Sequence, residues 1–106
     1  MATKLKAQFP RRMRIGRKMY SVEIVESMIC KGTMGRVNYS DKLIEVGRNC
    51  SITGHAFPAC EVRDSFWHEV THAILEDMGR HTLNRDETFV TEFANRLSAA
   101  IDSAKF

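Results

Sequence analysis

The sequence has no long apolar run and few cysteines. No stretch approaches the roughly 20 consecutive apolar residues that a membrane helix requires, and no apolar segment follows the basic N-terminus as it would in a secretory signal. Three cysteines, Cys30, Cys50 and Cys60, are too few and odd in number for a disulfide framework, which favours a reducing compartment. We therefore expect a cytoplasmic protein with no membrane partner.

The composition gives no indication of disorder or of a coiled coil. Of the 106 residues, 43% are hydrophobic and 27% are charged, as in ordinary globular domains. A chain of this length can form one small domain with one modest hydrophobic core. We expect residues 1–106 to form a single domain, and the sequence does not indicate its oligomeric state.

Acidic residues are missing from the first 18 positions, although the whole chain has 13. Basic residues are concentrated there instead, and the remainder of the chain is mildly acidic. Such a segment binds nucleic acid or an acidic protein, or is simply a solvated terminus. We expect residues 1–12 to form a flexible basic arm. The candidates for nucleic-acid contact within residues 4–18 are Lys4, Lys6, Arg11, Arg12, Arg14, Arg17 and Lys18.

The first half of the chain has the patterns of β-strands. Tyr20, Val22 and Ile24 alternate with other residues at the period of two that is typical of a half-buried strand. Turn-like residues separate two pairs of strands, so we expect two hairpins in a small antiparallel sheet within residues 13–47. The expected strands are Met13–Ile15, Met19–Val25, Arg36–Tyr39 and Leu43–Val46. Residues 47–63 are expected to form a loop.

The second half of the chain has helical patterns. Apolar residues recur every three or four positions from Phe66 to Met78, Asp64 or Ser65 can cap this helix, and Gly79 can end it. A polar connection, residues 80–85, leads to a second expected helix over Glu87–Ala104, which Asp86 can cap. Strands followed by helices predict an α+β fold, in which helices within residues 64–104 pack on one face of the sheet.

One motif carries chemistry: His68-Glu69-Val70-Thr71-His72, an H-E-x-x-H pentad in the first expected helix. Residues four apart lie on one side of a helix, so both imidazoles can bind one zinc ion. Glu69 points about 100° away from His68 around the helix. It can therefore reach a water molecule on the metal and act as the general base.

A catalytic zinc site needs a third protein ligand. Glu76 lies about 12 Å from His68 along the helix axis, which is too far. The metzincin pattern is excluded because Leu75 and Met78 stand where its glycine and third histidine are required. Glu87 lies at the edge of the packed face of the second helix and is the favoured third ligand. Glu92 and His81 remain alternatives.

The sequence resembles the small H-E-x-x-H zinc peptidases of the ImmA/IrrE type, which phages and mobile elements often encode. The resemblance covers most of the chain from about Arg14, and only the pentad is a specific match. The matching segments are Gly35–Tyr39, Leu43–Val46, Phe66–Leu75, Glu87–Val90 and Phe93–Leu97. It implies a minimal zincin-like fold and a gluzincin-like site, with His68, His72 and an acidic residue matching Glu87 as zinc ligands and Glu69 as general base.

These observations favour a Zn²⁺-dependent metallopeptidase that acts on a peptide or protein. An extended substrate is expected to pair with an exposed edge strand, for which Leu43–Val46 is the candidate. The alternative is a non-catalytic or weakly catalytic metal-binding protein that acts through its basic N-terminal arm on nucleic acid or a protein partner. The candidate donors to the oxyanion are Tyr20, Tyr39, Arg80, His81 and Arg85, and the sequence does not separate them.

Overall fold

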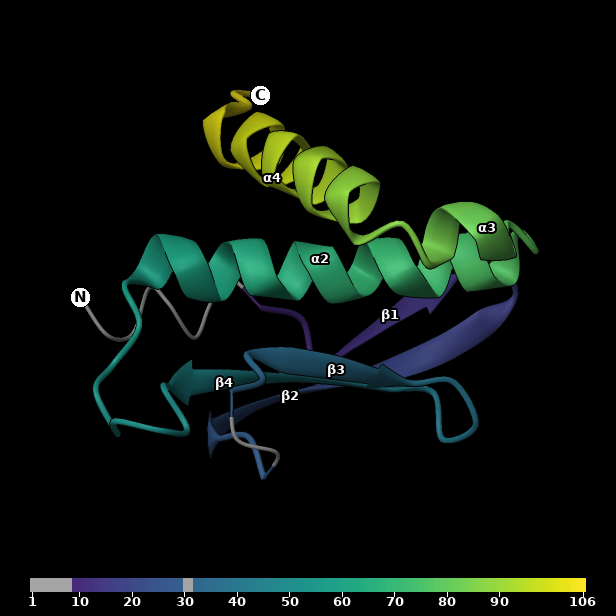
Figure 1. Ribbon diagram of the computed structural model, residues 1–106. Helices are drawn as coiled ribbons and strands as arrows, with labels where there is room; N and C mark the ends of the chain where they lie inside the picture. The colour runs from purple at the N-terminus through teal and green to yellow at the C-terminus, as the bar shows by residue number, and fades with distance from the viewer. Residues whose placement is uncertain (1–8, 30–31) are drawn as a thin grey trace.

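The protein folds into a four-stranded sheet followed by helices, as the computed structural model in Figure 1 shows. The structure describes residues 9–29 and 32–106. The strands are β1 (Arg12–Ile15), β2 (Lys18–Ser27), β3 (Gly35–Asn38) and β4 (Leu43–Asn49). The helices are α2 (Ala59–Asp77), α3 (His81–Asn84) and α4 (Glu87–Ser103). The α+β class expected from the sequence is confirmed.

The sheet is mixed, so the expectation of an antiparallel sheet is wrong. Its strand order is β1-β2-β4-β3. The two hairpins, β1–β2 and β3–β4, are antiparallel as expected, but they join through a parallel pairing in which Val22 is opposite Ile44. Alternation of apolar residues has the same period in both kinds of pairing, which is why the sequence did not indicate this junction. Because β4 is internal, Leu43–Val46 is not an edge strand, and the edges are β1 and β3.

The first main helix begins earlier than the sequence analysis indicated. It starts at Ala59 after Pro58, and neither Asp64 nor Ser65 is its cap. The buried side chain of Val62 extends the apolar row of Phe66 and Val70 back by one turn. Gly79 has a φ of 72°, which glycine adopts readily, and it follows the end of the helix as expected.

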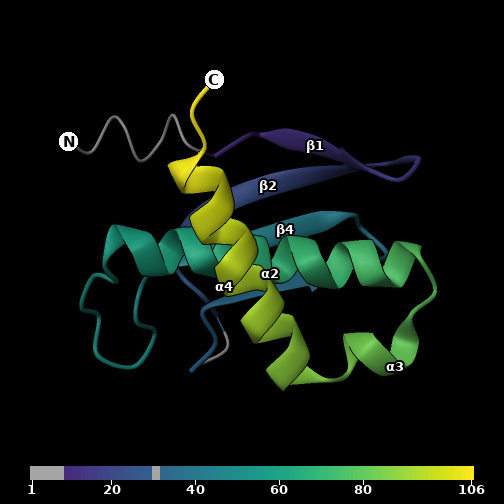
Figure 2. The same ribbon diagram turned by 90° about the horizontal axis from the view of Figure 1, so that it is seen from above.

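The second main helix begins where the sequence predicted. The carboxylate of Asp86 accepts a hydrogen bond from the backbone N–H of Phe89 over 3.1 Å, so Asp86 is the N-cap of α4. The polar connection before it contains a short helix, α3, formed by His81–Asn84. This cap fixes Glu87 as the first residue of α4, and α3 holds the preceding chain beside the end of α2 (Figure 2).

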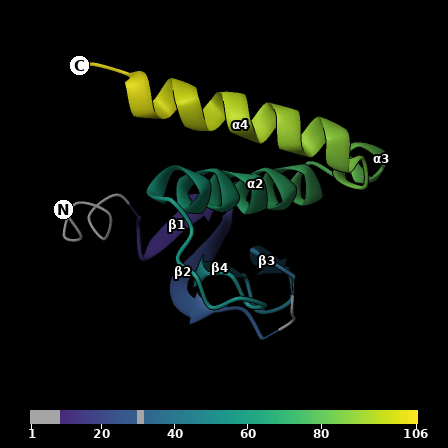
Figure 3. The ribbon, with the colours of Figure 1, turned by 60° about the vertical axis from the view of Figure 1, so that its left-hand side comes forward.

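The elements form three layers, with α2 between the sheet and α4 (Figure 3). One face of the sheet packs on α2 through buried side chains from both halves of the chain. At the outer interface, the fully buried Ser98 of α4 donates to Asp64 over 2.7 Å and accepts from Arg63 over 3.0 Å. The main core consists of Ile15, Tyr20, Val22, Ile44, Val46, Val62, Phe66, Val70 and Ala73.

The basic segment lies partly outside the described residues, which exclude Lys4 and Lys6. Its described part lies on and beside the β1–β2 hairpin, where every Lys and Arg side chain is exposed. Cys30 also lies outside the described residues. Within residues 9–29 and 32–106, none of the helices has the length and apolar character needed to cross a membrane. The exposed basic residues are Arg11, Arg12, Arg14, Arg17 and Lys18.

Candidate metal centre

The two histidines of the pentad lie one turn apart on α2, as the helical spacing predicted. Their rings face one another edge to face, with centroids 4.9 Å apart. Both side chains are largely buried, with exposed fractions of 23% for His68 and 14% for His72. Burial, reinforced by the neighbouring His72, lowers the pKa of His68 despite the opposing effect of Glu87. Low pKa values favour the neutral imidazole, which is the form that binds a metal.

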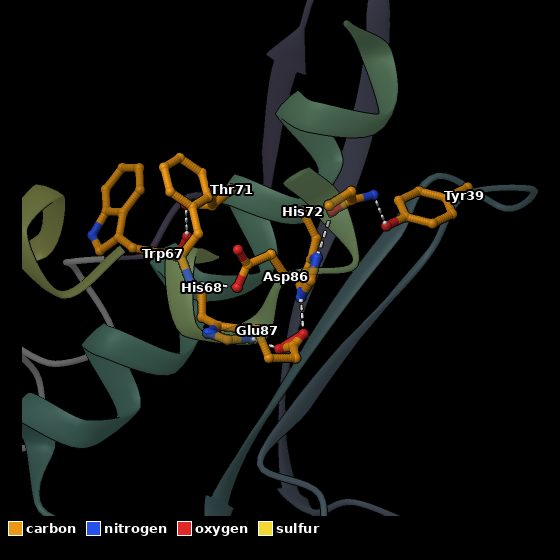
Figure 4. A network of polar contacts seen from close by, with 9 residues as sticks. Tyr39, Trp67, His68, Thr71, His72, Asp86 and Glu87 are labelled. Carbon is orange, nitrogen blue, oxygen red and sulfur yellow. Dashed lines mark hydrogen bonds and ion pairs between the residues drawn. The ribbon is translucent and has the colours of Figure 1, made fainter. Parts of the chain in front are cut away.

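Glu87 reaches both histidines from the first turn of α4 (Figure 4). Its Oε1 lies 3.1 Å from Nε2 of His68, and its Oε2 lies 3.0 Å from Nε2 of His72. His68, His72 and Glu87 each offer one ligand atom, and these three atoms lie within 4.8 Å of one another. These three side chains therefore form a group that could hold a metal ion.

Asn84 orients the second histidine. Its Oδ1 lies 2.6 Å from Nδ1 of His72, and its Nδ2 donates to the hydroxyl of Tyr39 over 3.1 Å. Since the amide oxygen only accepts, Nδ1 of His72 is the donor in this contact. In neutral His72, Nε2 therefore carries the lone pair, and that lone pair points towards the carboxylate of Glu87. Two acceptors in this arrangement require a proton or a cation between them.

Glu69 is the most deeply buried carboxylate of the site, with an exposed fraction of 7%. Burial raises its pKa to about 7; nearby Glu87 contributes to the rise, and His72 opposes it. The side chain makes no hydrogen bond or ion pair with another described residue, yet it lines the hollow in front of the two histidines. A carboxyl group with these properties can exchange a proton at neutral pH.

The hollow in front of the histidines has a volume of about 510 Å³ and is bounded by β3, α2 and the α3–α4 connection. Of the expected oxyanion donors, Tyr39 and Arg85 line it. The side chain of Tyr20 is buried in the core instead. Arg80 and His81 line a different, smaller hollow.

The alternative third ligands lie elsewhere among the described residues. Nδ1 of His81 lies 3.6 Å from Oε1 of Glu76, away from the two histidines of the pentad. Glu92 is exposed on α4 and does not belong to the group that could hold an ion. The structure thus brings together His68, His72 and Glu87, with Glu69 beside them.

Sequence reasoning missed Asn84. The residue lies in the polar connection expected between the two main helices, and its contact with His72 depends on the turn of helix formed by α3. An asparagine just before the Asp86 cap was the available signal, but asparagine is also common in such connections for conformational reasons.

Comparisons of the chain with family models, with curated proteins and with solved structures found no match.

Proposed function

We propose that this protein is a zinc-dependent peptidase of the small ImmA/IrrE-like kind, with His68, His72 and Glu87 as zinc ligands. One observation carries the proposal: the carboxylate of Glu87 meets both imidazoles of an H-E-x-x-H helix, at 3.1 and 3.0 Å. The pentad alone supplies two ligands and a base. The arrival of a third ligand from another helix gives the donor set of a catalytic site with an open position.

The donor set fits zinc. Two imidazole nitrogens and one carboxylate oxygen are borderline-soft ligands that zinc accepts readily. Tetrahedral ligands at about 2.0–2.1 Å from an ion lie about 3.3 Å from one another, and the observed N–O separations are within a few tenths of an ångström of that value. A bound cation would also be a partner for both Nε2 of His72 and the carboxylate of Glu87, which otherwise face each other as two acceptors. The ligand atoms of the group lie within 4.8 Å of one another, so side-chain movements would bring all three to tetrahedral separations.

A bound zinc ion supplies a Lewis acid that polarises a carbonyl and makes water more acidic. The chain's own residues supply the other steps. Glu69 takes the proton of the attacking water and delivers it to the leaving amine, a double role that suits a pKa near 7. The hydroxyl of Tyr39 accepts from Asn84, so its own proton is free for donation. Burial raises the pKa of Tyr39 and keeps that proton in place, and Tyr39 can stabilise the developing oxyanion.

The substrate would lie along β3. This strand is at the edge of the sheet and lines the hollow through Gly35, Arg36 and Val37. An edge strand has one side on which its backbone groups lack a strand partner, and an extended peptide can pair with it there. Pairing would bring a peptide carbonyl past His68 and His72. This choice of strand replaces the expectation that Leu43–Val46 binds the peptide.

A second candidate function rests on the basic hairpin. Among the described residues, Arg11, Arg12, Arg14, Arg17 and Lys18 are exposed and make no ion pair. Such a surface could bind nucleic acid, with an affinity that falls steeply as salt rises. Charge reversal at Arg12 and Arg14 should abolish nucleic-acid binding and leave the metal content unchanged. Under the peptidase proposal, the same two substitutions should not change the zinc-dependent hydrolysis of an uncharged peptide.

Replacement of the base tests the proposed function. The zinc-loaded protein and its Glu69→Gln variant are incubated with a defined mixture of unstructured peptides, and cleavage is followed by mass spectrometry. We expect the variant to keep its zinc and to lose about 100-fold or more of the rate. Glu92→Gln, an exposed change on α4, is the matched control and should cleave normally. Equal rates for wild type and Glu69→Gln would refute the proposed chemistry.

A further inference from the structure

α4, the outermost layer of the fold, is attached to the rest of the protein by a narrow interface. It packs on α2 and on the short α3, and α2 separates it from the sheet (Figure 3). Of its 17 residues only Val90, Ala94 and Ser98 are buried, whereas α2 buries eight of its 19. These three small side chains form one row with a spacing of four residues. Because apolar burial is the main favourable term in helix docking, α4 is the long helix that is most easily released.

One polar attachment ties the C-terminal half of α4 to α2. The fully buried Ser98 donates to Asp64 over 2.7 Å and accepts from Arg63 over 3.0 Å. Arg63 also pairs with Asp102, one turn further along α4, at 2.9 Å. Since all of these bonds join one protein group to another, this attachment does not need a metal ion.

The other polar attachment, at the N-terminus of α4, is the candidate metal centre itself. There the carboxylate of Glu87 meets His68 and His72 of α2. Nε2 of neutral His72 and this carboxylate are both acceptors, so a bound cation completes the contact and bridges the two helices. The same segment forms one wall of the hollow in front of the histidines, through Asn84, Arg85 and Glu87. The attachment of α4 and the shape of the hollow therefore depend on the same group of ligands.

We propose that α4 closes on α2 when a metal ion binds at His68, His72 and Glu87, and that it moves away from α2 when the ion leaves. The inference rests on the ligand set of the proposed function. Without the ion, only the buried row and the Ser98 contacts hold α4, and a helix of this length gains most of its stability from packing. The metal-free protein then populates an open state in which α2 and the sheet stay folded and the hollow lacks one wall. The supply of metal thereby controls whether the hollow is complete.

The coupling between metal binding and closure must be reciprocal. If the ion closes α4, a change that favours the open state must weaken metal binding, because a smaller fraction of the protein is competent to bind. Ser98 lies about 16 Å from Glu87 along the helix axis, and its partners are Arg63 and Asp64 rather than the metal ligands. Replacement of Ser98 therefore tests the coupling at a distance from the metal centre.

Hydrogen exchange measures the opening directly. Amide exchange of the full chain is followed by mass spectrometry of its peptides, in excess zinc and in excess chelator. In chelator we expect residues 91–103 to exchange about tenfold or more faster than the inner strands β2 and β4, and we expect zinc to slow them at least tenfold. Glu87→Gln should keep the fast exchange of α4 when zinc is present. Glu92→Gln, an exposed change on the same helix, is the matched control and should close like wild type.

Zinc affinity tests the reciprocal effect. Competition with a chromogenic chelator gives the Kd of Ser98→Ala and of its matched control Ser103→Ala, which changes an exposed serine of the same helix. We expect Ser98→Ala to weaken zinc binding about three- to tenfold and the control to bind normally. Asp102→Asn weakens the pair with Arg63 at a half-exposed site and should cost about twofold. This milder variant carries the test if Ser98→Ala does not fold.

Three results would each overturn the inference: equal exchange of α4 and the inner strands in chelator, α4 exchange that zinc does not slow, or normal zinc affinity in both Ser98→Ala and Asp102→Asn. Failure of the proposed function would look different, because α4 would still close on zinc while no peptide was cleaved. Conversely, a protein that cleaves peptides while its α4 exchanges alike with and without zinc would refute the closure and leave the proposed function standing.

Discussion

The Nδ1 of His72 donates to Oδ1 of Asn84 over 2.6 Å, and this contact determines which imidazole nitrogen faces Glu87. Partners of this kind fix the tautomer and ring orientation of metal-binding histidines. We expect Asn84→Ala to weaken zinc affinity about 10- to 100-fold, as measured by competition with a chromogenic chelator. Asn84→Asp keeps the acceptor and should lose much less. Unchanged affinity in the alanine variant would show that Asn84 does not orient His72.

Tyr39 gives a second prediction. Its hydroxyl accepts from Asn84 and lines the hollow before the histidines. If it stabilises the oxyanion, Tyr39→Phe should lower kcat about 100-fold and leave KM and zinc content nearly unchanged. If the zinc content instead falls as much as in Asn84→Ala, the role of Tyr39 is to hold Asn84 in position.

The buried carboxyl of Glu69 predicts a pH dependence of stability in the metal-free protein. Its pKa rises from 4.5 to about 7 on folding, so the folded state favours the protonated form. The resulting stabilisation is complete below pH 4.5 and is lost as the pH rises to 7, by about 3 kcal/mol. Urea unfolding in excess chelator should therefore show Glu69→Gln gaining stability relative to wild type between pH 4.5 and pH 8. Parallel pH profiles for the two proteins would contradict this prediction.

Gly35 lies where β3 passes close to α2. A Cβ at this position would lie 2.9 Å from the backbone oxygen of Glu45, 3.1 Å from Oγ of Ser65 and 3.2 Å from Cγ of Glu69. We expect Gly35→Ala to lower the free energy of unfolding by about 1–3 kcal/mol, because the strand must move away from the helix. Ser21→Ala, on the exposed face of β2, should have a small effect by the same chemical denaturation assay. A normal stability for Gly35→Ala would show that this contact is loose.

The sequence was most informative where a local pattern determines structure. The pentad on α2, the Asp86 cap and the start of α4 at Glu87 all follow from helix spacing and capping chemistry. Glu87 was favoured because it lies at the edge of the packed face of its helix, and the structure places it beside His68 and His72. The expected division of the chain into a basic arm (residues 1–12), a sheet region (13–47) and a helical region (64–104) stays a prediction.

The features that were missed depend on contacts between distant segments. The parallel pairing of Val22 with Ile44 cannot be recognised from the alternation of apolar and polar residues in either strand. It also moves the edge of the sheet from β4 to β3, which changes the strand proposed to bind substrate. The earlier start of α2 was missed because residues 47–63 were expected to form a loop. Proline is well tolerated at a helix start, and Val62 continues the apolar row of the helix.

Metal analysis tests the central claim that His68, His72 and Glu87 hold one zinc ion. The wild-type protein, the variants His68→Ala, His72→Ala and Glu87→Ala, and the control Glu92→Ala are purified with zinc, dialysed and measured by mass spectrometry of the metal. We expect one zinc ion per chain in wild type and Glu92→Ala, and a loss of bound zinc in the three ligand variants. Full zinc content in Glu87→Ala, or none in the wild type, would contradict the account.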